Sequence, residues 1–188
     1  MKNILIIFFV FLFSFNVISC SRKDSGSSST STDSDGTTNS CFSTSISSRQ
    51  LARSSNDYAY GVATDSSGNV YVAGGTNGGL DGNTNAGNTD LFVVKYNSSG
   101  TKQWTRQLGS SSRDSANDVA TDSSGNIYVT GTTYWELDGN TSAGKADLFV
   151  VKYNSSGTWQ WTKQNGTDRY DEARGVATDS SGNVYVTG

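Results

Sequence analysis

One segment decides the fold of this chain: Gly61-Val62-Ala63-Thr64-Asp65-Ser66-Ser67-Gly68-Asn69-Val70-Tyr71-Val72 recurs with two changes at 118–129 and unchanged at 175–186. The interval is 57 residues each time. The similarity extends beyond this segment, because residues 61–108 and 118–165 are identical at 35 of 48 positions. Self-similarity at a fixed period is the signature of a repeat architecture, so the chain is built from tandem copies of one unit.

Each unit contains four stretches typical of short strands, at 61–64, 70–73, 91–96 and 103–108 in the first copy. An Asx residue with a glycine three positions later joins the strands in pairs: Asp65 with Gly68, and Asn97 with Gly100. An Asx side chain can accept a hydrogen bond from the backbone N–H two residues on, and glycine tolerates the positive φ that closes a tight turn. We therefore interpret the recurring aspartates, Asp65, Asp122 and Asp179, as hairpin residues and not as metal ligands.

Four antiparallel strands in each tandem unit predict the blades of a β-propeller, whereas a coil of a β-helix would be shorter. The predicted fold class is all-β, a partial β-propeller of 57-residue blades. The repeats run in the phase 48–57, 58–114, 115–171 and 172–188, which gives about two and a half blades. The recurring tryptophans, Trp104 and Trp161, are expected in the core between blades.

The unit also resembles a known family. Its two characteristic stretches are Gly-Val-Ala-Thr-Asp-Ser-Ser-Gly-Asn-Val-Tyr-Val and Asp-Leu-Phe-Val-Val-Lys-Tyr-Asn-Ser-Ser-Gly-Thr. Together they are similar to the SBBP β-propeller repeat of bacterial surface proteins, over about residues 48–188. The resemblance implies a propeller of the seven-bladed type and no established activity. Because propellers have about 4–8 blades, we expect open blade edges and self-association through them.

The N-terminus reads as an export signal. Lys2 precedes an apolar run from Ile4 to Phe13, which is too short to span a bilayer as a helix. The following Val17-Ile18-Ser19-Cys20 resembles a bacterial lipobox in the relaxed form of spirochaete lipoproteins, with valine where leucine is usual. The resemblance implies that Cys20 is acylated, with palmitate among its chains, and anchors the protein to a membrane. An ordinary signal peptide with an incidental cysteine is the alternative.

These observations divide the chain into a lipoprotein signal peptide (1–19), a lipidated cysteine with a Ser/Thr-rich disordered tether (20–46) and the SBBP-like repeats (47–188). The expected location is the outer membrane or the cell surface, with the periplasmic face as an alternative. Once Cys20 is acylated, Cys41 has no intrachain partner and is a free thiol or an intermolecular one.

Composition excludes several function classes. The chain has no histidine, which removes Ser-His-Asp and Cys-His catalysis and histidine metal ligation. Its formal charge of −3 gives no basic face for nucleic acid. We expect no cofactor, no metal and no catalytic residue.

Alternating strands place both hairpin turns of a unit on one face and the long loops, 76–89 and 133–146, on the other. Long loops on a rigid scaffold commonly carry binding residues. The two loops differ most where Asn77-Gly78-Gly79 becomes Tyr134-Trp135-Glu136. Tyr134, Trp135 and Glu136 are therefore the candidate ligand-binding residues, for a sugar or a protein partner. Packing of the rings on the next blade is the alternative.

The expected function is that of a non-catalytic binding module on a membrane-anchored lipoprotein. Two alternatives stay open: a glycan-active enzyme that uses loop carboxylates, and a truncated gene product without independent function.

Overall fold

The computed structural model describes residues 30–32, 38–40 and 55–188. The chain divides into two compact units, Met1–Ile46 and Ser47–Gly188. In the first unit, β1 (Thr30–Thr32) pairs antiparallel with β2 (Thr38–Ser40). Cys20, the signal peptide, Cys41 and most of the tether lie outside the described residues, so these assignments stay predictions. Among the residues that are described, no helix is long and apolar enough to cross a membrane.

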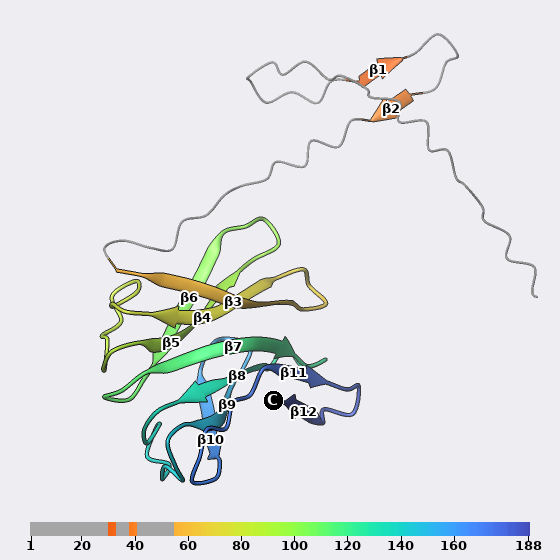
Figure 1. The fold of residues 1–188 in the computed structure, drawn as a ribbon. Coiled ribbons are helices and arrows are strands. Elements are labelled where there is room, and N and C mark those ends of the chain that lie inside the picture. Colours follow the sequence, from red (N-terminus) through yellow and green to blue (C-terminus); the bar gives the residue numbers. More distant parts are fainter. Residues whose placement is uncertain (1–29, 33–37, 41–54) are drawn as a thin grey trace, which may run out of the picture. The chain divides into compact units, whose positions relative to one another are not determined.

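The second unit consists of antiparallel sheets in which each strand pairs with the next one along the chain (Figure 1). The first sheet contains β3 (Asp57–Thr64), β4 (Val70–Thr76), β5 (Asp90–Tyr96) and β6 (Lys102–Leu108). The second contains β7 (Asp114–Thr121), β8 (Ile127–Thr133), β9 (Asp147–Tyr153) and β10 (Trp159–Asn165). A two-stranded sheet follows, formed by β11 (Gly175–Thr178) and β12 (Val184–Thr187).

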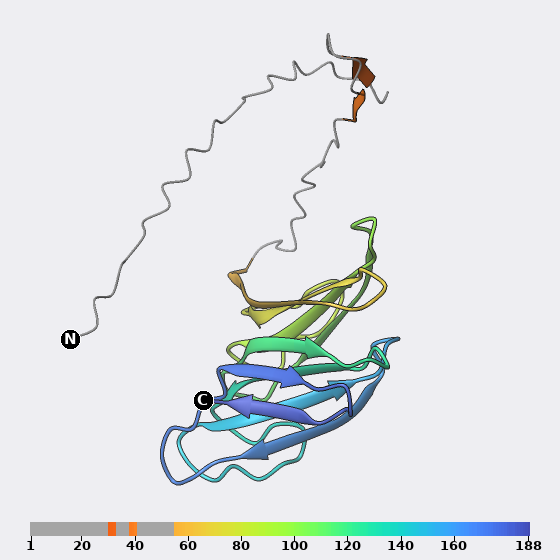
Figure 2. The ribbon, with the colours of Figure 1, turned by 90° about the vertical axis from the view of Figure 1, so that its right-hand side faces the viewer.

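This architecture confirms the predicted fold class. Two four-stranded blades and half of a third follow one another with the same strand order, and they do not close a ring. Within residues 55–188 there is no helix, so every connection is a turn or a loop. The protein is an all-β, partial β-propeller, and its blades lie against one another in Figure 2.

The hairpin turns have the predicted chemistry. Oδ1 of Asp65 accepts hydrogen bonds from the backbone N–H groups of Ser67 and Asn69, at 2.9 and 3.0 Å. Gly68 has a φ of +75°, a conformation that residues with a Cβ atom rarely adopt. The same turn returns around Asp122 and Asp179. The recurring aspartates therefore close hairpins.

The first strand of each four-stranded blade is longer than the sequence predicted. β3 begins at Asp57, because Tyr58 and Ala59 pair with Gly75 and Gly74 at the end of β4. A Cβ atom at Gly74 would collide with the carbonyl oxygen of Tyr58, so the close approach depends on that glycine. A register shift between Ala59 and Gly61 marks a β-bulge. The added residues bring Tyr58 to the edge of the blade where the long loops lie.

The core sits between the blades. Successive side chains of a strand point to opposite faces of its sheet. Leu91 and Val93 of β5 accordingly pack with Phe149 and Val151 of the second blade. Phe92 and Val94 of β5 belong to a second cluster on the opposite face. Trp104 packs against the interblade cluster, as predicted. Both faces of the central strands are thus buried, which fixes each blade against its neighbour.

The long loops share one edge of this scaffold. Because the strands alternate, the β4–β5 loop (77–89) and the β8–β9 loop (134–146) lie beside the β6–β7 and β10–β11 connections (109–113 and 166–174). Two isolated parallel bridges tie them together, Thr89 with Arg113 and Ala146 with Tyr170. We call this edge the loop face; the hairpin turns lie on the opposite edge.

Candidate functional site

The three predicted binding residues lie at the start of the β8–β9 loop, on the loop face, and they point in different directions. Tyr134 is half-buried and meets the ring of Tyr170 edge to face, with ring centroids 6.4 Å apart. Trp135 is 55% exposed and Glu136 is also exposed. Tyr134 therefore packs toward the next repeat, whereas the other two side chains face solvent.

A partly buried network of hydrogen bonds holds this loop in place. Nε2 of Gln164 donates to the carbonyl oxygen of Trp135 at 3.1 Å and to Oδ2 of Asp147 at 2.7 Å, and Oε1 of Gln164 accepts from the backbone N–H of Leu137 at 2.9 Å. Gln107 and Asp90 do the same for the β4–β5 loop. The long loops are therefore tied to the sheet, which favours a pre-formed binding surface.

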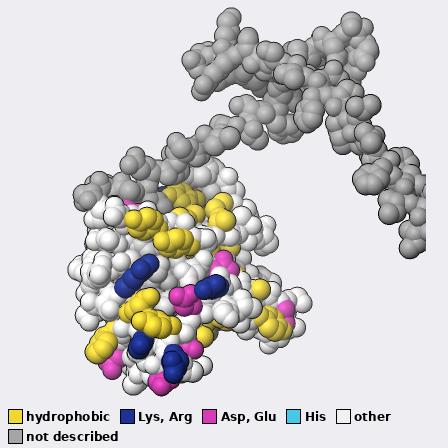
Figure 3. All heavy atoms as spheres, viewed as in Figure 1, with side chains coloured by type: hydrophobic (Ala, Val, Ile, Leu, Met, Phe, Trp, Pro, Cys, Tyr) yellow, Lys and Arg dark blue, Asp and Glu magenta, His cyan; other side chains and the backbone are white. Residues whose placement is uncertain are grey.

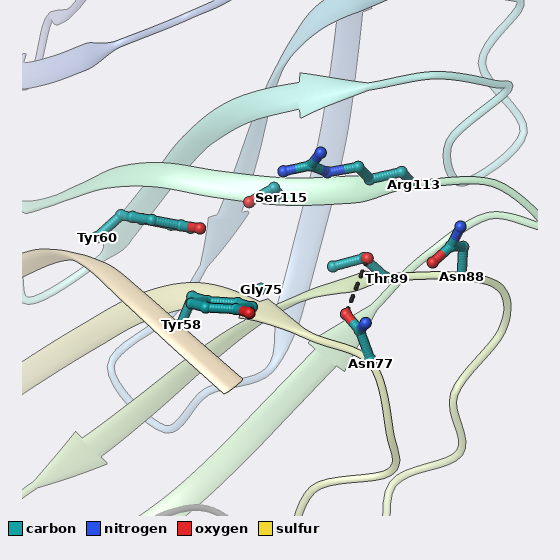
Figure 4. A pocket seen from close by; sticks show the side chains of 8 residues that line it. All are labelled: Tyr58, Tyr60, Gly75, Asn77, Asn88, Thr89, Arg113 and Ser115. Atoms are coloured by element: carbon teal, nitrogen blue, oxygen red, sulfur yellow. Dashed lines mark hydrogen bonds between the residues drawn. The ribbon is translucent and has the colours of Figure 1, made fainter. Parts of the chain in front are cut away.

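A cavity of about 340 Å³ opens on the loop face between the first and second blades. Figure 4 shows the hydroxyl groups of Tyr58 and Tyr60 pointing into it, with the guanidinium of Arg113 reaching across from the β6–β7 connection. The remaining lining residues are Gly75, Asn77, Asn88, Thr89 and Ser115. All of the lining side chains are polar or aromatic, which suits a ligand that offers hydrogen-bonding groups.

An adjoining cavity of about 220 Å³ lies between the second blade and the half blade. Tyr60, Arg113 and Ser115 line both cavities, and the second adds Asn117, Thr132, Tyr134 and Glu172. Several of these residues are the 57-residue counterparts of residues in the first cavity: Thr132 of Gly75, Tyr134 of Asn77 and Glu172 of Ser115. Each blade junction therefore forms a cavity in the same place, with different side chains.

The surface around these cavities combines rings and charges. Figure 3, in the view of Figure 1, shows hydrophobic side chains, tyrosine included, gathered in patches with basic side chains between them. Tyr58 and Tyr60 are 50% and 54% exposed. Glu172 pairs with Arg174 at 3.2 Å. In the part of the chain that the structure describes, the guanidinium of Arg113 forms no ion pair or hydrogen bond.

Two carboxylates that are adjacent in sequence to residues lining the first cavity, Asp90 and Asp114, are buried and have structural roles, whereas Glu172, which lines the second cavity, is exposed. Asp90 and Asp114 are 1% and 0% exposed. Burial raises the pKa of Asp114, and hydrogen bonds donated by Thr133 and Ser110 oppose that rise without cancelling it. Oδ2 of Asp90 accepts hydrogen bonds from Ala86 and Gln107. These acids hold loops together and are out of reach of a bound substrate.

The carboxylates of the hairpin aspartates also accept hydrogen bonds within their own turns. In Asp122, burial favours a higher pKa, but hydrogen bonds from Asn126, Tyr128 and Ser124 outweigh it and lower the pKa. Among the described residues, no three His, Cys, Asp or Glu side chains are grouped closely enough to hold a metal ion.

Sequence reasoning identified the loop face but missed half of the site. Tyr58, Tyr60 and Arg113 were not predicted, because Tyr58 and Tyr60 precede the expected first strand and Arg113 lies in a short connection. The available signal was the alternation of the two tyrosines along an extended segment. A second signal was the replacement of Arg113 by Tyr170 in the next copy of the repeat. It resembles the replacement of Asn77 by Tyr134, which identified Tyr134 as a candidate.

The chain is similar to parts of two known proteins. The chain is 31% identical over 139 residues to the regulatory protein FlaEY of Caulobacter vibrioides, covering 66% of this chain and 15% of that protein. It is 28% identical over 127 residues to the uncharacterized WD repeat-containing protein L264 of Acanthamoeba polyphaga mimivirus, covering 58% of this chain and 9% of that protein.

The chain thus spans only a small part of the length of either relative. A family model described as a beta-propeller repeat, SBBP, matches residues 48–81, 103–134 and 160–188. These matches fall in every copy of the repeat and together cover half of the chain, so the chain belongs to the SBBP β-propeller repeat family.

Proposed function

We propose that this protein is a non-catalytic binding module that holds a partner or ligand on its loop face. The observation that carries the proposal is the pair of adjoining cavities between the blades. Polar and aromatic side chains line them, and partly buried hydrogen bonds fix the long loops beside them in place. Pre-formed concave sites with a few convergent polar groups are typical of ligand binding. Trp135 and Glu136 extend the surface beyond the cavities.

Two considerations favour binding over catalysis. A carboxylate glycosidase needs two accessible acids that face each other across the bond to be broken, whereas the acids next to the first cavity, Asp90 and Asp114, are buried. The names of the relatives, a regulatory protein and a WD repeat-containing protein, also suit repeat modules that bind other molecules. The chain covers only 15% and 9% of those proteins, so their own roles are not transferred.

The proposal is tested by exposing the chain to arrays of glycans and of bacterial surface proteins and then assaying bound glycans for hydrolysis. We expect binding without turnover. Trp135→Ala should weaken that binding, because it removes an exposed ring from the loop face, and Trp159→Ala is the matched control: this ring is 49% exposed at the hairpin edge. Hydrolysis of a bound glycan, or equal loss of binding in both variants, would contradict the proposal.

We further propose that acylated Cys20 tethers the module to a membrane, as the Val17-Ile18-Ser19-Cys20 segment implies. Two or more acyl chains give stable attachment. Detergent partitioning of the wild type and of Cys20→Ala tests the tether. The wild type should enter the detergent phase and the variant should stay in the aqueous phase; recovery of both in the aqueous phase would contradict it.

A further inference from the structure

We infer that the first cavity, where Arg113 meets Tyr58 and Tyr60, binds a saccharide that carries a carboxylate group. This inference rests on the proposed function and names the ligand class of the same loop face. Three features of the described residues support it: an unpaired cation, a pair of half-exposed rings, and a lining without aliphatic side chains.

The charge of the cavity favours an anion. Arg113 is the only charged residue among the eight that line it, and within the described part of the chain its guanidinium has no acidic partner. Arginine is a donor only, and its planar fork matches a carboxylate in two parallel hydrogen bonds. Oδ1 of Asn77 already accepts from the hydroxyl of Thr89 at 3.0 Å, which leaves the amide nitrogen of Asn77 to donate. The site therefore offers donors to an acceptor-rich ligand.

The rings favour a sugar. Tyr58 and Tyr60 lie nearly parallel, with an interplanar angle of 11° and centroids 6.3 Å apart, and their hydroxyl groups point into the cavity (Figure 4). A tyrosine ring offers an apolar face and a polar tip. A pyranose presents the matching combination, a face of C–H groups and a rim of hydroxyl groups.

The lining disfavours a peptide. Protein interfaces depend on a few apolar or aromatic anchors that fill desolvated pockets. None of the residues that line either cavity has an aliphatic side chain, so an apolar anchor of a protein partner finds no pocket there.

The next blade junction repeats the combination with different residues. Asn88 becomes Lys145, Arg113 becomes Tyr170 and Asn77 becomes Tyr134, so one cation and two rings stand at other positions of the repeat. Nζ of Lys145 lies 5.4 Å from the centroid of the Tyr170 ring, which in turn meets Tyr134. Two rings beside one cation therefore also lie near the second junction, and of these three residues Tyr134 lines the second cavity. Since Arg113 lines both cavities, a ligand with repeating sugar units can run from one junction to the next.

Arg113 can be changed without disturbing the junction. Its neighbours are joined through the backbone: the N–H of Asp114 donates to the carbonyl oxygen of Thr89 at 2.7 Å, and the N–H of Tyr134 donates to that of Arg113 at 3.0 Å. The side chain is exposed and has no other role among the described residues. Arg113→Gln therefore removes the charge and keeps the fold, which circular dichroism would verify.

The experiment is calorimetric titration of the full chain with a panel of carboxylate-bearing oligosaccharides (oligogalacturonate, alginate oligomers and sialyllactose), each also as its methyl ester. The wild type should bind at least one acid form about tenfold more tightly than its ester, the difference expected for one charge-assisted hydrogen-bond pair. Arg113→Gln should abolish that preference. Lys163→Gln, which removes an exposed charge from β10, should retain it.

Each other outcome overturns the inference. Equal binding of acid and ester by the wild type, an unchanged preference in Arg113→Gln, or no binding across the panel would all do so. Tighter binding of a polyglutamate peptide would assign the cation to acidic peptides instead. If the protein binds a neutral saccharide or a protein, and Trp135→Ala abolishes that binding while Arg113→Gln does not, the inference is wrong but the proposed function stands. If no array member binds to the loop face, the inference and the proposed function are both wrong.

Discussion

Trp104 of β6 packs its indole ring on Gly157, in the hairpin turn between β9 and β10 of the next blade. A Cβ atom at Gly157 would lie 2.8 Å from Cε2 of that ring. Beside this contact, Nε of Arg106 donates to the carbonyl oxygen of Gly157 at 2.6 Å, and the ring of Tyr71 lies 6.1 Å from that of Trp104. A turn glycine and a tryptophan 53 positions earlier in the sequence thus join the first blade to the second.

Gly157→Ala should destabilise the protein more than Gly139→Ala. Both glycines have a positive φ, +78° and +75°, so both variants carry the same backbone strain of about 1–2 kcal/mol. Only the first variant also pushes a methyl group into Trp104, because nothing lies within 4 Å of a Cβ atom at Gly139. Urea unfolding measures the difference, which we expect to be about 1–3 kcal/mol. Equal destabilisation would mean that the ring does not rest on the glycine.

Gln164→Leu should loosen the β8–β9 loop. The variant removes the amide that binds Trp135, Asp147 and Leu137, and it leaves the backbone N–H of the buried Leu137 without its acceptor. Such a loss costs about 1–3 kcal/mol. Gln160→Leu, also on β10, removes hydrogen bonds only at an exposed site and should change stability by less than about 0.5 kcal/mol. Hydrogen exchange at Leu137 should increase in the first variant only; protection that stays equal in both variants would contradict the role of the network.

Asp122→Asn should make stability less dependent on pH in acid. Although burial opposes them, hydrogen bonds from Asn126, Tyr128 and Ser124 lower the pKa of Asp122 in the folded protein. Because the folded-state pKa lies below the unfolded one, this contribution is fully present above about pH 4 and is lost as the pH falls through the folded-state pKa. The variant should be less stable at neutral pH and lose less stability on acidification. The control is Asp168→Asn, an exposed carboxylate. Equal acid sensitivity in wild type and Asp122→Asn would contradict this assignment.

The parts of the fold that repeat in the sequence were predictable from it. The Asp65 and Gly68 spacing implied a hairpin, and the structure has the expected hydrogen bonds and a positive φ there. Such features depend on contacts within a few residues, which local sequence chemistry determines. The position of the long loops on one face was predictable as well, because consecutive strands joined by short turns alternate in direction.

The cavities were not predictable, because they form between segments that are distant in sequence. Tyr58 and Arg113 meet only when the second blade packs on the first, and β3 extends to Tyr58 only because Gly74 allows the backbones to approach. Asp90 and Asp147 occupy the same position in two copies of the repeat, yet their role depends on Gln107 and Gln164 of the neighbouring strands.

The last prediction concerns association between chains. Val62 is 66% exposed, whereas its counterparts in the next repeats, Val119 and Val176, are 3% and 9% exposed. Tyr185 is 55% exposed, whereas its counterparts Tyr71 and Tyr128 are 0% and 2% exposed. The first blade therefore presents the face that a preceding blade covers, and the half blade presents the face that a following strand covers. Two such faces are complementary in a head-to-tail contact.

Sedimentation velocity of the Cys20→Ala chain should reveal association that increases with concentration. Val62→Ser should weaken it about tenfold, since burying a valine stabilises by about 1.5 kcal/mol. Trp135→Gln, which changes an apolar side chain that is 55% exposed on the loop face, should leave it unchanged because that ring lies outside the blade faces. A compact monomer at every concentration, unfolding in one cooperative step, would show that the exposed blade faces need no partner. Equal weakening in both variants would point to non-specific contact between apolar side chains instead of packing between blades.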